Sequence, residues 1–179
     1  MMQEFSVRPV PKNQNARRLF FILLGSAAAL VAVSYLMSSY RGIVQLFALI
    51  LLVASVMIYT RYIGSYYTYD LTVDSDGTPI FVVCQYSGKR RSSLCRVDLA
   101  DITDIKSLTA EQYRAYKTEA GVKRYNYTPT LNPPEVHLLK VRSHSEKADV
   151  LLEISAEYCE ALLSYAQQAR AMRPLDGEE

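Results

Sequence analysis

Two long apolar runs near the start of the chain constrain its fold more than any other feature. Residues 19–40 (LFFILLGSAAALVAVSYLMSSY) and 43–62 (IVQLFALILLVASVMIYTRY) contain no acidic residue, and their one basic residue, Arg61, lies at an edge. Each run has about the 20 helical residues that cross a hydrocarbon core. Only Arg41 and Gly42 separate the runs, so two spanning helices would have to return as an antiparallel hairpin.

The alternatives to membrane spans are buried helices of a soluble protein and a cleaved signal peptide. Buried helices of a soluble protein are rarely apolar on all sides over this length. A cleaved signal peptide has a shorter apolar stretch followed by a cleavage site, whereas the first run here begins after about 18 residues and is longer. The pattern therefore predicts a transmembrane hairpin over residues 19–63.

The distribution of charge predicts how the hairpin is oriented. Residues 1–18 carry four basic residues and one acidic residue, whereas residues 63–179 carry 14 Lys/Arg and 17 Asp/Glu, a net of 14 − 17 = −3. Basic flanks stay in the cytoplasm. We therefore expect a multi-pass protein of the plasma membrane with both termini cytoplasmic. The mildly acidic second part disfavours nucleic acid as a partner, because such binders carry a basic excess on the folded domain.

Small residues recur at four-residue spacing in the first apolar run, at Gly25, Ala28, Ala29 and Ala32. Such spacing lets helices approach closely in lipid. The simplest use is packing of one span against the other, and the alternative is a dimer contact or a docking face for a membrane protein partner. No ionisable residue lies inside either run, which disfavours a self-sufficient transporter or channel.

The pattern changes to short β segments after residue 64. Alternating, β-branched and aromatic residues predict strands, Asp76-Gly77 and Gly88-Lys89 predict turns, and Thr109 with Gln112 predicts a capping box. The expected strands are 67–73, 79–86, 91–99, 135–143 and 149–155, with a short element at 101–108, a helix at 110–120 and an extended edge at 122–129.

A final amphipathic helix completes the expected domain. Ser155 is a plausible N-cap, and the apolar face comprises Cys159, Leu162, Leu163, Ala166 and Ala169. The fold class is therefore a membrane α-helical hairpin plus an α+β domain, with an antiparallel, partly open β-barrel capped by the C-terminal helix. The expected boundaries are a basic cytosolic segment at 1–18, the hairpin at 19–63, the domain at 64–173 and a flexible acidic tail at 174–179.

Two segments carry a likeness to a known family. These are Arg96–Ile105 (RVDLADITDI) and the final strand and helix, Val150–Met172. Together with the hairpin, they resemble the bacterial pleckstrin-homology-like (PH-like) domains. The resemblance implies a binding or scaffolding module. It also implies that the basic turn Lys89, Arg90 and Arg91 contacts lipid headgroups, whereas the simpler interpretation is a charged turn that keeps a hairpin edge soluble.

Chemical motifs are not apparent in this sequence. It contains no phosphate-binding glycine loop, nucleophile elbow or HExxH zinc motif, and it has two histidines, His137 and His144. The carboxylates Asp98, Asp101 and Asp104 are expected to be solvated. The three cysteines are expected to be inert, although Cys84 and Cys95 flank one turn. We therefore expect no catalytic residue, no metal and no cofactor.

Two functions follow as hypotheses. The first is a non-enzymatic membrane protein whose PH-like domain binds lipid headgroups or a protein partner at the inner leaflet. The second is a small accessory subunit of a larger membrane complex, docked through its spans. The expected partners are membrane lipids, together with either a membrane protein partner or a second copy of the chain, and not nucleic acid.

Overall fold

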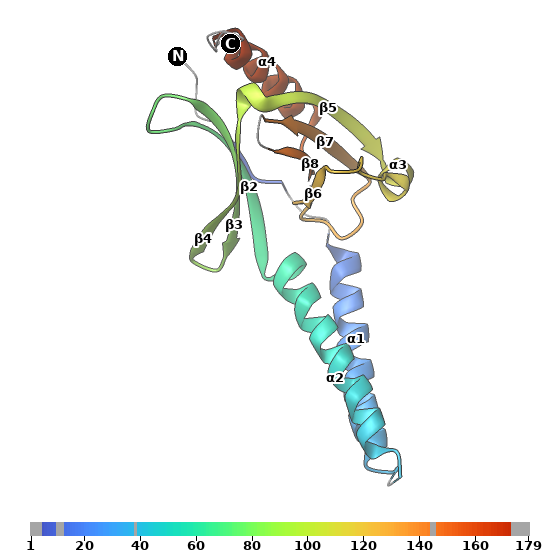
Figure 1. The fold of residues 1–179 in the computed structure, drawn as a ribbon. Helices are drawn as coiled ribbons and strands as arrows, with labels where there is room; N and C mark the ends of the chain where they lie inside the picture. The colour runs from blue at the N-terminus through green and yellow to red at the C-terminus, as the bar shows by residue number, and fades with distance from the viewer. Residues whose placement is uncertain (1–4, 10–12, 38, 144–145, 173–179) are drawn as a thin grey trace.

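The chain folds into a long helical hairpin and a β domain that sits on the open end of that hairpin (Figure 1). The structure, a computed structural model, describes residues 5–9, 13–37, 39–143 and 146–172. The expected acidic tail, Lys12 and His144 lie outside the described residues.

The hairpin consists of two helices that are long and apolar enough to cross a membrane. These are α1 (Gln14–Ser34) and α2 (Arg41–Ile58), and α2 continues into a π-helical turn, η1 (Tyr59–Ile63). The two candidate spans contain 21 and 23 residues, against the roughly 20 that a bilayer requires. Each span buries only 11% of its most apolar window inside the protein. The apolar surface therefore faces outward, as it does in a lipid-exposed helix.

The connection between the helices differs from the expected one. Arg41 and Gly42 belong to the first turn of α2, and residues 35–40 make the connection instead. Residues 35–40 are apolar enough to extend the first run in the sequence, and hydropathy alone does not show where the backbone turns. The guanidinium of Arg41 lies 4.8 Å from the ring centre of Tyr35 at the tip.

Small buried side chains pack the two helices against each other. The fully or nearly buried residues of the pair are Ala16, Ala27 and Ser34 on α1, and Ala48 and Ser55 on α2. Small residues permit close approach of helix backbones. Two polar contacts also cross the interface: Gln45 Nε2 donates to Ser34 Oγ at 3.4 Å, and Ser55 Oγ donates to the Phe20 carbonyl at 3.5 Å.

One sheet of the β domain, sheet A, is a three-stranded antiparallel meander with one added edge strand, four strands in all. Its strands, in spatial order, are β1 (Phe5–Val7), β2 (Ser65–Val73), β3 (Pro79–Ser87) and β4 (Arg90–Asp98). Strand β1 comes from the segment before the hairpin and pairs Phe5 with Leu71. The N-terminal segment is thus part of the β domain rather than a separate basic arm.

The second sheet, sheet B, is mixed rather than purely antiparallel. A 3₁₀ turn, η2 (Leu99–Asp101), leads from sheet A into it. Its spatial order is β5 (Ile102–Thr109), β7 (Glu135–Arg142), β8 (Lys147–Leu152) and β6 (Lys123–Asn126), and the short helix α3 (Ala110–Ala115) follows β5. Strand β6 runs parallel to β8, because residues 127–134 carry the chain across to β7 before it turns back. The expected antiparallel pairing is therefore corrected at β6.

The two sheets do not close into a barrel. Among the described residues, no ladder joins β4 to either edge of sheet B. A groove of about 360 Å³ separates β4 from β6 and β8, and the Tyr127 hydroxyl bridges it by donating to the Leu94 carbonyl at 3.3 Å. The domain is a pair of facing sheets with an open seam.

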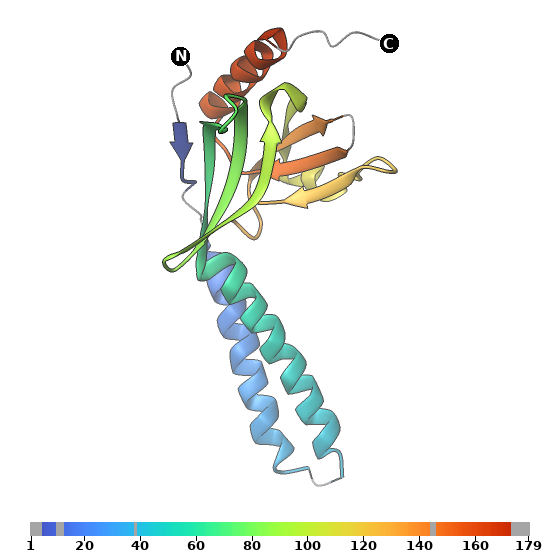
Figure 2. The ribbon, with the colours of Figure 1, turned by 60° about the vertical axis from the view of Figure 1, so that its left-hand side comes forward.

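The helix α4 (Ala156–Met172) covers the end of the two sheets that lies farthest from the hairpin (Figure 2). Ser155 begins it as expected, accepting from the Tyr158 amide at 3.3 Å. The Tyr158 side chain is 2% exposed and its hydroxyl donates to the Tyr69 carbonyl at 3.1 Å. The core between α4 and the two sheets includes Tyr69, Leu71, Phe81, Val83, Leu99, Ile102, Leu139, Val150 and Leu152, together with Tyr158 and Leu162 of α4.

Candidate functional site

The basic turn singled out in the sequence lies at the end of the β domain nearest the hairpin. Lys89 and Arg90, in the β3–β4 turn, are exposed, and Figures 1 and 2 show that turn level with the start of α1 and the end of α2. Gly88 supplies the positive φ, +60°, that this tight turn requires. The β2–β3 turn, which carries Asp74 and Asp76, lies at the opposite end (Figure 1). Exposed cations therefore lie at the hairpin end of the domain, and the opposite end carries Asp76 together with Asp74, which pairs with Arg96.

Arg91 is held more firmly than its two neighbours. Its guanidinium pairs with Asp70 at 3.1 Å and donates to the Cys84 sulfur at 3.3 Å from Nε. The Arg91 side chain is still 58% exposed. Arg91 therefore combines a structural contact with a charge that faces solvent, whereas Lys89 and Arg90 extend from the turn.

Two arginines and two tyrosines form a stacked row on the outer face of sheet A. The Tyr66 and Tyr86 rings are parallel, with centroids 4.9 Å apart, because their strands pair these residues directly. Arg8 lies 3.8 Å above Tyr66, and Arg91 lies 5.9 Å from Tyr86. This Arg8–Arg91 row adds a cation from the N-terminal segment to the end of the β domain nearest the hairpin. Sequence reasoning missed it because Arg8 is brought there by the long-range pairing of β1.

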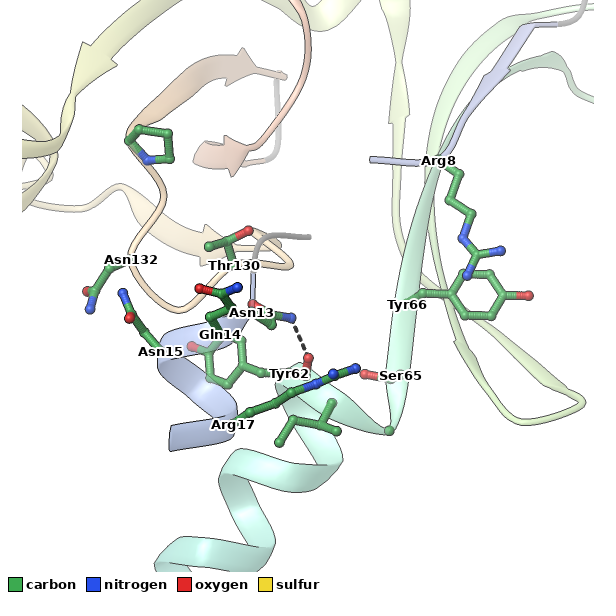
Figure 3. A pocket seen from close by; sticks show the side chains of 13 residues that line it. Arg8, Asn13, Gln14, Asn15, Arg17, Tyr62, Ser65, Tyr66, Thr130 and Asn132 are labelled. Carbon is green, nitrogen blue, oxygen red and sulfur yellow. Dashed lines mark hydrogen bonds between the residues drawn. The ribbon is translucent and has the colours of Figure 1, made fainter. Parts of the chain in front are cut away.

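A cavity of about 780 Å³ lies at the junction between the hairpin and the β domain (Figure 3). Five segments build this junction cavity: the end of β1, the N-terminus of α1, η1, the start of β2 and the loop 130–134. Its lining residues are Arg8, Asn13, Gln14, Asn15, Arg17, Tyr62, Ile63, Gly64, Ser65, Tyr66, Thr130, Asn132 and Pro134.

Asn13 holds the walls of the junction cavity together. Its side-chain Nδ2 donates to the carbonyls of Tyr62, in η1, and Pro129, at 3.1 Å in the second case. Ser65 Oγ donates to the Arg61 carbonyl at 3.0 Å, and Arg61 in turn donates to the Asn126 carbonyl at 3.1 Å. These contacts tie the helix ends to both sheets, so the cavity is a built feature of the junction.

The junction cavity is electropositive. Arg17 extends along it, Arg8 borders it with a guanidinium that stacks on Tyr66 on the other side of β2, and none of the described lining residues is acidic (Figure 3). The N-terminus of α1 opens there without a side-chain cap and without an acidic residue in its first turn. A helix N-terminus presents unpaired amide N–H groups and the positive end of the helix dipole. The sequence shows the arginine but not the cavity, because the five segments that form the cavity are distant from one another in the chain.

The predicted helix-packing residues lie outside the hairpin interface. Gly25, Ala28, Ala29 and Ala32 are all exposed, and a Cβ built on Gly25 meets no atom within 4 Å. Ala27, one position away, is the buried residue of this stretch. The small-residue pattern therefore remains unused within one copy of the chain, which leaves a dimer contact or a docking face for a membrane protein partner as its other interpretation.

No model of a known protein family matches this chain, and no curated protein sequence is significantly similar to it. The likeness to PH-like domains stays a prediction.

The groups considered for chemistry are mostly buried or occupied in local structure. His137 is 5% exposed, and burial lowers its pKa. Burial raises the pKa of the Cys95 thiol to about 11, and that of Cys159 above its usual value. Asp98 Oδ1 accepts from the Ala100 amide at 2.9 Å and so caps η2. All three cysteines are free thiols, and within the described ranges no group of three His, Cys, Asp or Glu is placed to hold a metal.

Other basic residues that might have extended the basic turn lie elsewhere. Lys123 pairs with Glu146 at 2.8 Å, and Arg142 pairs with Asp149 at 3.1 Å. Arg124 lies over the Tyr113 and Tyr116 rings, 5.6 Å from each centroid. The cations at the hairpin end of the β domain are therefore a set separate from Lys123, Arg124 and Arg142.

Proposed function

We propose that the chain is a two-span membrane protein, with both termini cytoplasmic, whose β domain is a non-enzymatic binding module for anionic lipid headgroups at the inner leaflet. In this proposal the domain is PH-like in architecture. The hairpin holds it at the membrane surface, so that even weak headgroup contacts are made at high local concentration.

One observation carries the proposal: cations and tyrosines gather at the end of the β domain that meets the hairpin. Lys89 and Arg90 lie at the β3–β4 turn, and the Arg8–Arg91 row lies beside them. Tyrosine is favoured at this depth because its ring is apolar and its hydroxyl reaches water. A surface that faces anionic headgroups would be built in this way.

Charges close to an anionic leaflet contribute more to binding than the net charge of the domain does. A Lys or Arg close to an anionic leaflet contributes about 1 kcal/mol. Charges farther than a Debye length, about 10 Å at 0.1 M salt, are largely screened. Carboxylates at the far end of the domain, such as Asp76 in the β2–β3 turn, therefore oppose binding only weakly.

The test uses the full chain in a mild non-ionic detergent, titrated with an anionic or a choline phospholipid of identical acyl chains. Native mass spectrometry counts the bound lipids. We expect the anionic lipid to bind more tightly, and Lys89→Gln/Arg90→Gln to weaken it about tenfold to thirtyfold at low salt. The matched control Arg114→Gln/Lys117→Gln removes two exposed charges on and just after α3 and should leave binding unchanged. Equal binding of the two lipids by the wild-type chain would refute the proposal.

A second candidate function is a small accessory subunit of a larger membrane complex. The observation that favours it is the exposed face of Gly25, Ala28, Ala29 and Ala32, which the hairpin itself does not use. We expect a stoichiometric membrane protein to co-purify from native membranes in mild detergent and to be lost with Gly25→Leu/Ala29→Leu. Substitution of Ile22, an exposed residue of ordinary size, by Leu is the control. A particle of one chain only, under conditions that keep complexes intact, would contradict this function.

A further inference from the structure

We propose that the junction cavity holds the headgroup of one anionic phospholipid, with its phosphate between Arg17 and the N-terminus of α1. This inference rests on the proposed function, because it requires the hairpin to cross the membrane. It adds a defined, single-lipid site to the general attraction of the basic turn.

The position of the junction cavity matches the depth at which headgroups lie. Its floor is the first turn of α1 and the turn η1, and the apolar sequence of α1 begins at Leu19, immediately below Arg17 and Arg18. Figure 3 shows Arg17 extending from α1 toward Ser65 at the base of β2. A volume of about 780 Å³ lies within the 300–1,000 Å³ usual for small-molecule sites, so the cavity is large enough for a lipid headgroup.

The charges in the junction cavity favour a phosphate. Within the described part of the chain, Arg17 has no acidic partner, and the lining itself contains no carboxylate, since Glu153 lies behind it and accepts from Thr130 N and Oγ1 at 3.1 and 2.9 Å. Arginine presents a planar set of donors that suits phosphate oxygens. The open N-terminus of α1 adds backbone N–H donors, the arrangement that binds phosphate in many proteins.

Charge also decides which lipids the cavity should distinguish. Phosphatidylglycerol carries a net negative charge, whereas phosphatidylcholine is neutral overall, so the guanidinium of Arg17 should favour phosphatidylglycerol.

The experiment compares two neighbouring arginines in the full chain. Arg17 lines the cavity, whereas Arg18 is exposed in the same helical turn and does not line it. The detergent-solubilised chain is titrated with phosphatidylglycerol or phosphatidylcholine of the same acyl chains, and native mass spectrometry measures the affinity of the most tightly bound copy. We expect one copy of phosphatidylglycerol to be retained. Arg17→Gln should weaken its binding at least about tenfold, and Arg18→Gln should leave it nearly unchanged. Circular dichroism checks that both variants are folded.

Other outcomes separate the cavity from the basic turn. Equal losses in the two arginine variants, or a loss only in Lys89→Gln/Arg90→Gln, would overturn the cavity site while leaving the proposed function standing. No preference for phosphatidylglycerol in the wild-type chain would overturn both. A further arm adds soluble glycerol phosphate as competitor. If that compound fills the site and no lipid copy is retained in its absence, the ligand is a soluble phosphate and the lipid assignment is wrong.

Discussion

The most demanding test of the fold concerns a buried ion pair in sheet B. Asp149, on β8, is completely buried, and its Oδ1 accepts from Arg142 Nη1 and Nη2 at 3.1 and 3.2 Å. The other oxygen, Oδ2, accepts from the Tyr116 hydroxyl. Arg142 is thus the cation that compensates a carboxylate inside the protein.

The cost of removing that cation follows from the burial. Two unit charges about 4 Å apart attract by about 4 kcal/mol at an effective dielectric constant of about 20. Removing one partner of a buried pair costs about 3–5 kcal/mol, whereas replacing both is much milder. We therefore expect Arg142→Met to cost about 3–5 kcal/mol, and Arg142→Met/Asp149→Asn about 1–2 kcal/mol. At about 4 °C per kcal/mol, the single variant should melt about 12–20 °C below the wild type.

Thermal unfolding of the full chain in non-ionic detergent measures these costs. The chain has 14 tyrosines and no tryptophan, so near-ultraviolet circular dichroism follows the packing of the tyrosine-rich β domain. Lys106→Met is the control. It breaks a pair with Asp104 whose side chains are 56% and 43% exposed, and exposed pairs contribute at most about 1 kcal/mol. The reasoning is refuted if Arg142→Met costs no more than Lys106→Met, or if the double variant is as unstable as the single one.

Three further predictions concern titration and reactivity. Burial raises the pKa of Tyr127 and Tyr158 above that of unfolded tyrosine, near 10. Their contribution to stability is therefore complete below about pH 10 and is lost as the pH rises, so Tyr127→Phe and Tyr158→Phe should each reduce the fall in melting temperature above about pH 10, and an unchanged alkaline profile in both variants would contradict this. Burial lowers the pKa of His137, so its contribution is present above about pH 6.5 and is lost as the pH falls through the folded-state pKa. His137→Gln should flatten the stability profile in that range, measured by the same melting assay. With a thiol pKa of about 11, Cys95 is about 0.1% thiolate at pH 8, so mass spectrometry should detect slow alkylation in the folded chain and fast alkylation after unfolding.

Local signals in the sequence predicted most of the elements. The Asp76-Gly77 turn is confirmed, since Gly77 has φ +86° and Asp76 Oδ1 accepts from the Thr78 amide at 3.0 Å. The capping box at Thr109 and Gln112 is confirmed, although α3 ends at Ala115 rather than near residue 120. These features depend on neighbours in the chain, which is why a sequence pattern records them.

The features that were missed depend on contacts between distant residues. Strand β1 is three residues long and pairs across more than 60 positions, so no local pattern marks it. Tyr158 begins the buried face of α4 with Leu162, Ala166 and Ala169, whereas the predicted apolar face began at Cys159. The junction cavity was missed for the same reason as β1, because its walls come from five separate segments.

The pairing of β1 with β2 has a consequence for how the chain can be threaded through a bilayer. The hairpin is inserted between two adjacent strands of one sheet, so the chain must leave the β domain and return to it on the same face. In a membrane, only an even number of crossings allows Phe5 to meet Leu71. Pairing of β1 with β2 thus constrains how the hairpin can insert, in addition to the distribution of flanking charge. A chain that crossed the bilayer once would place β1 and β2 on opposite sides.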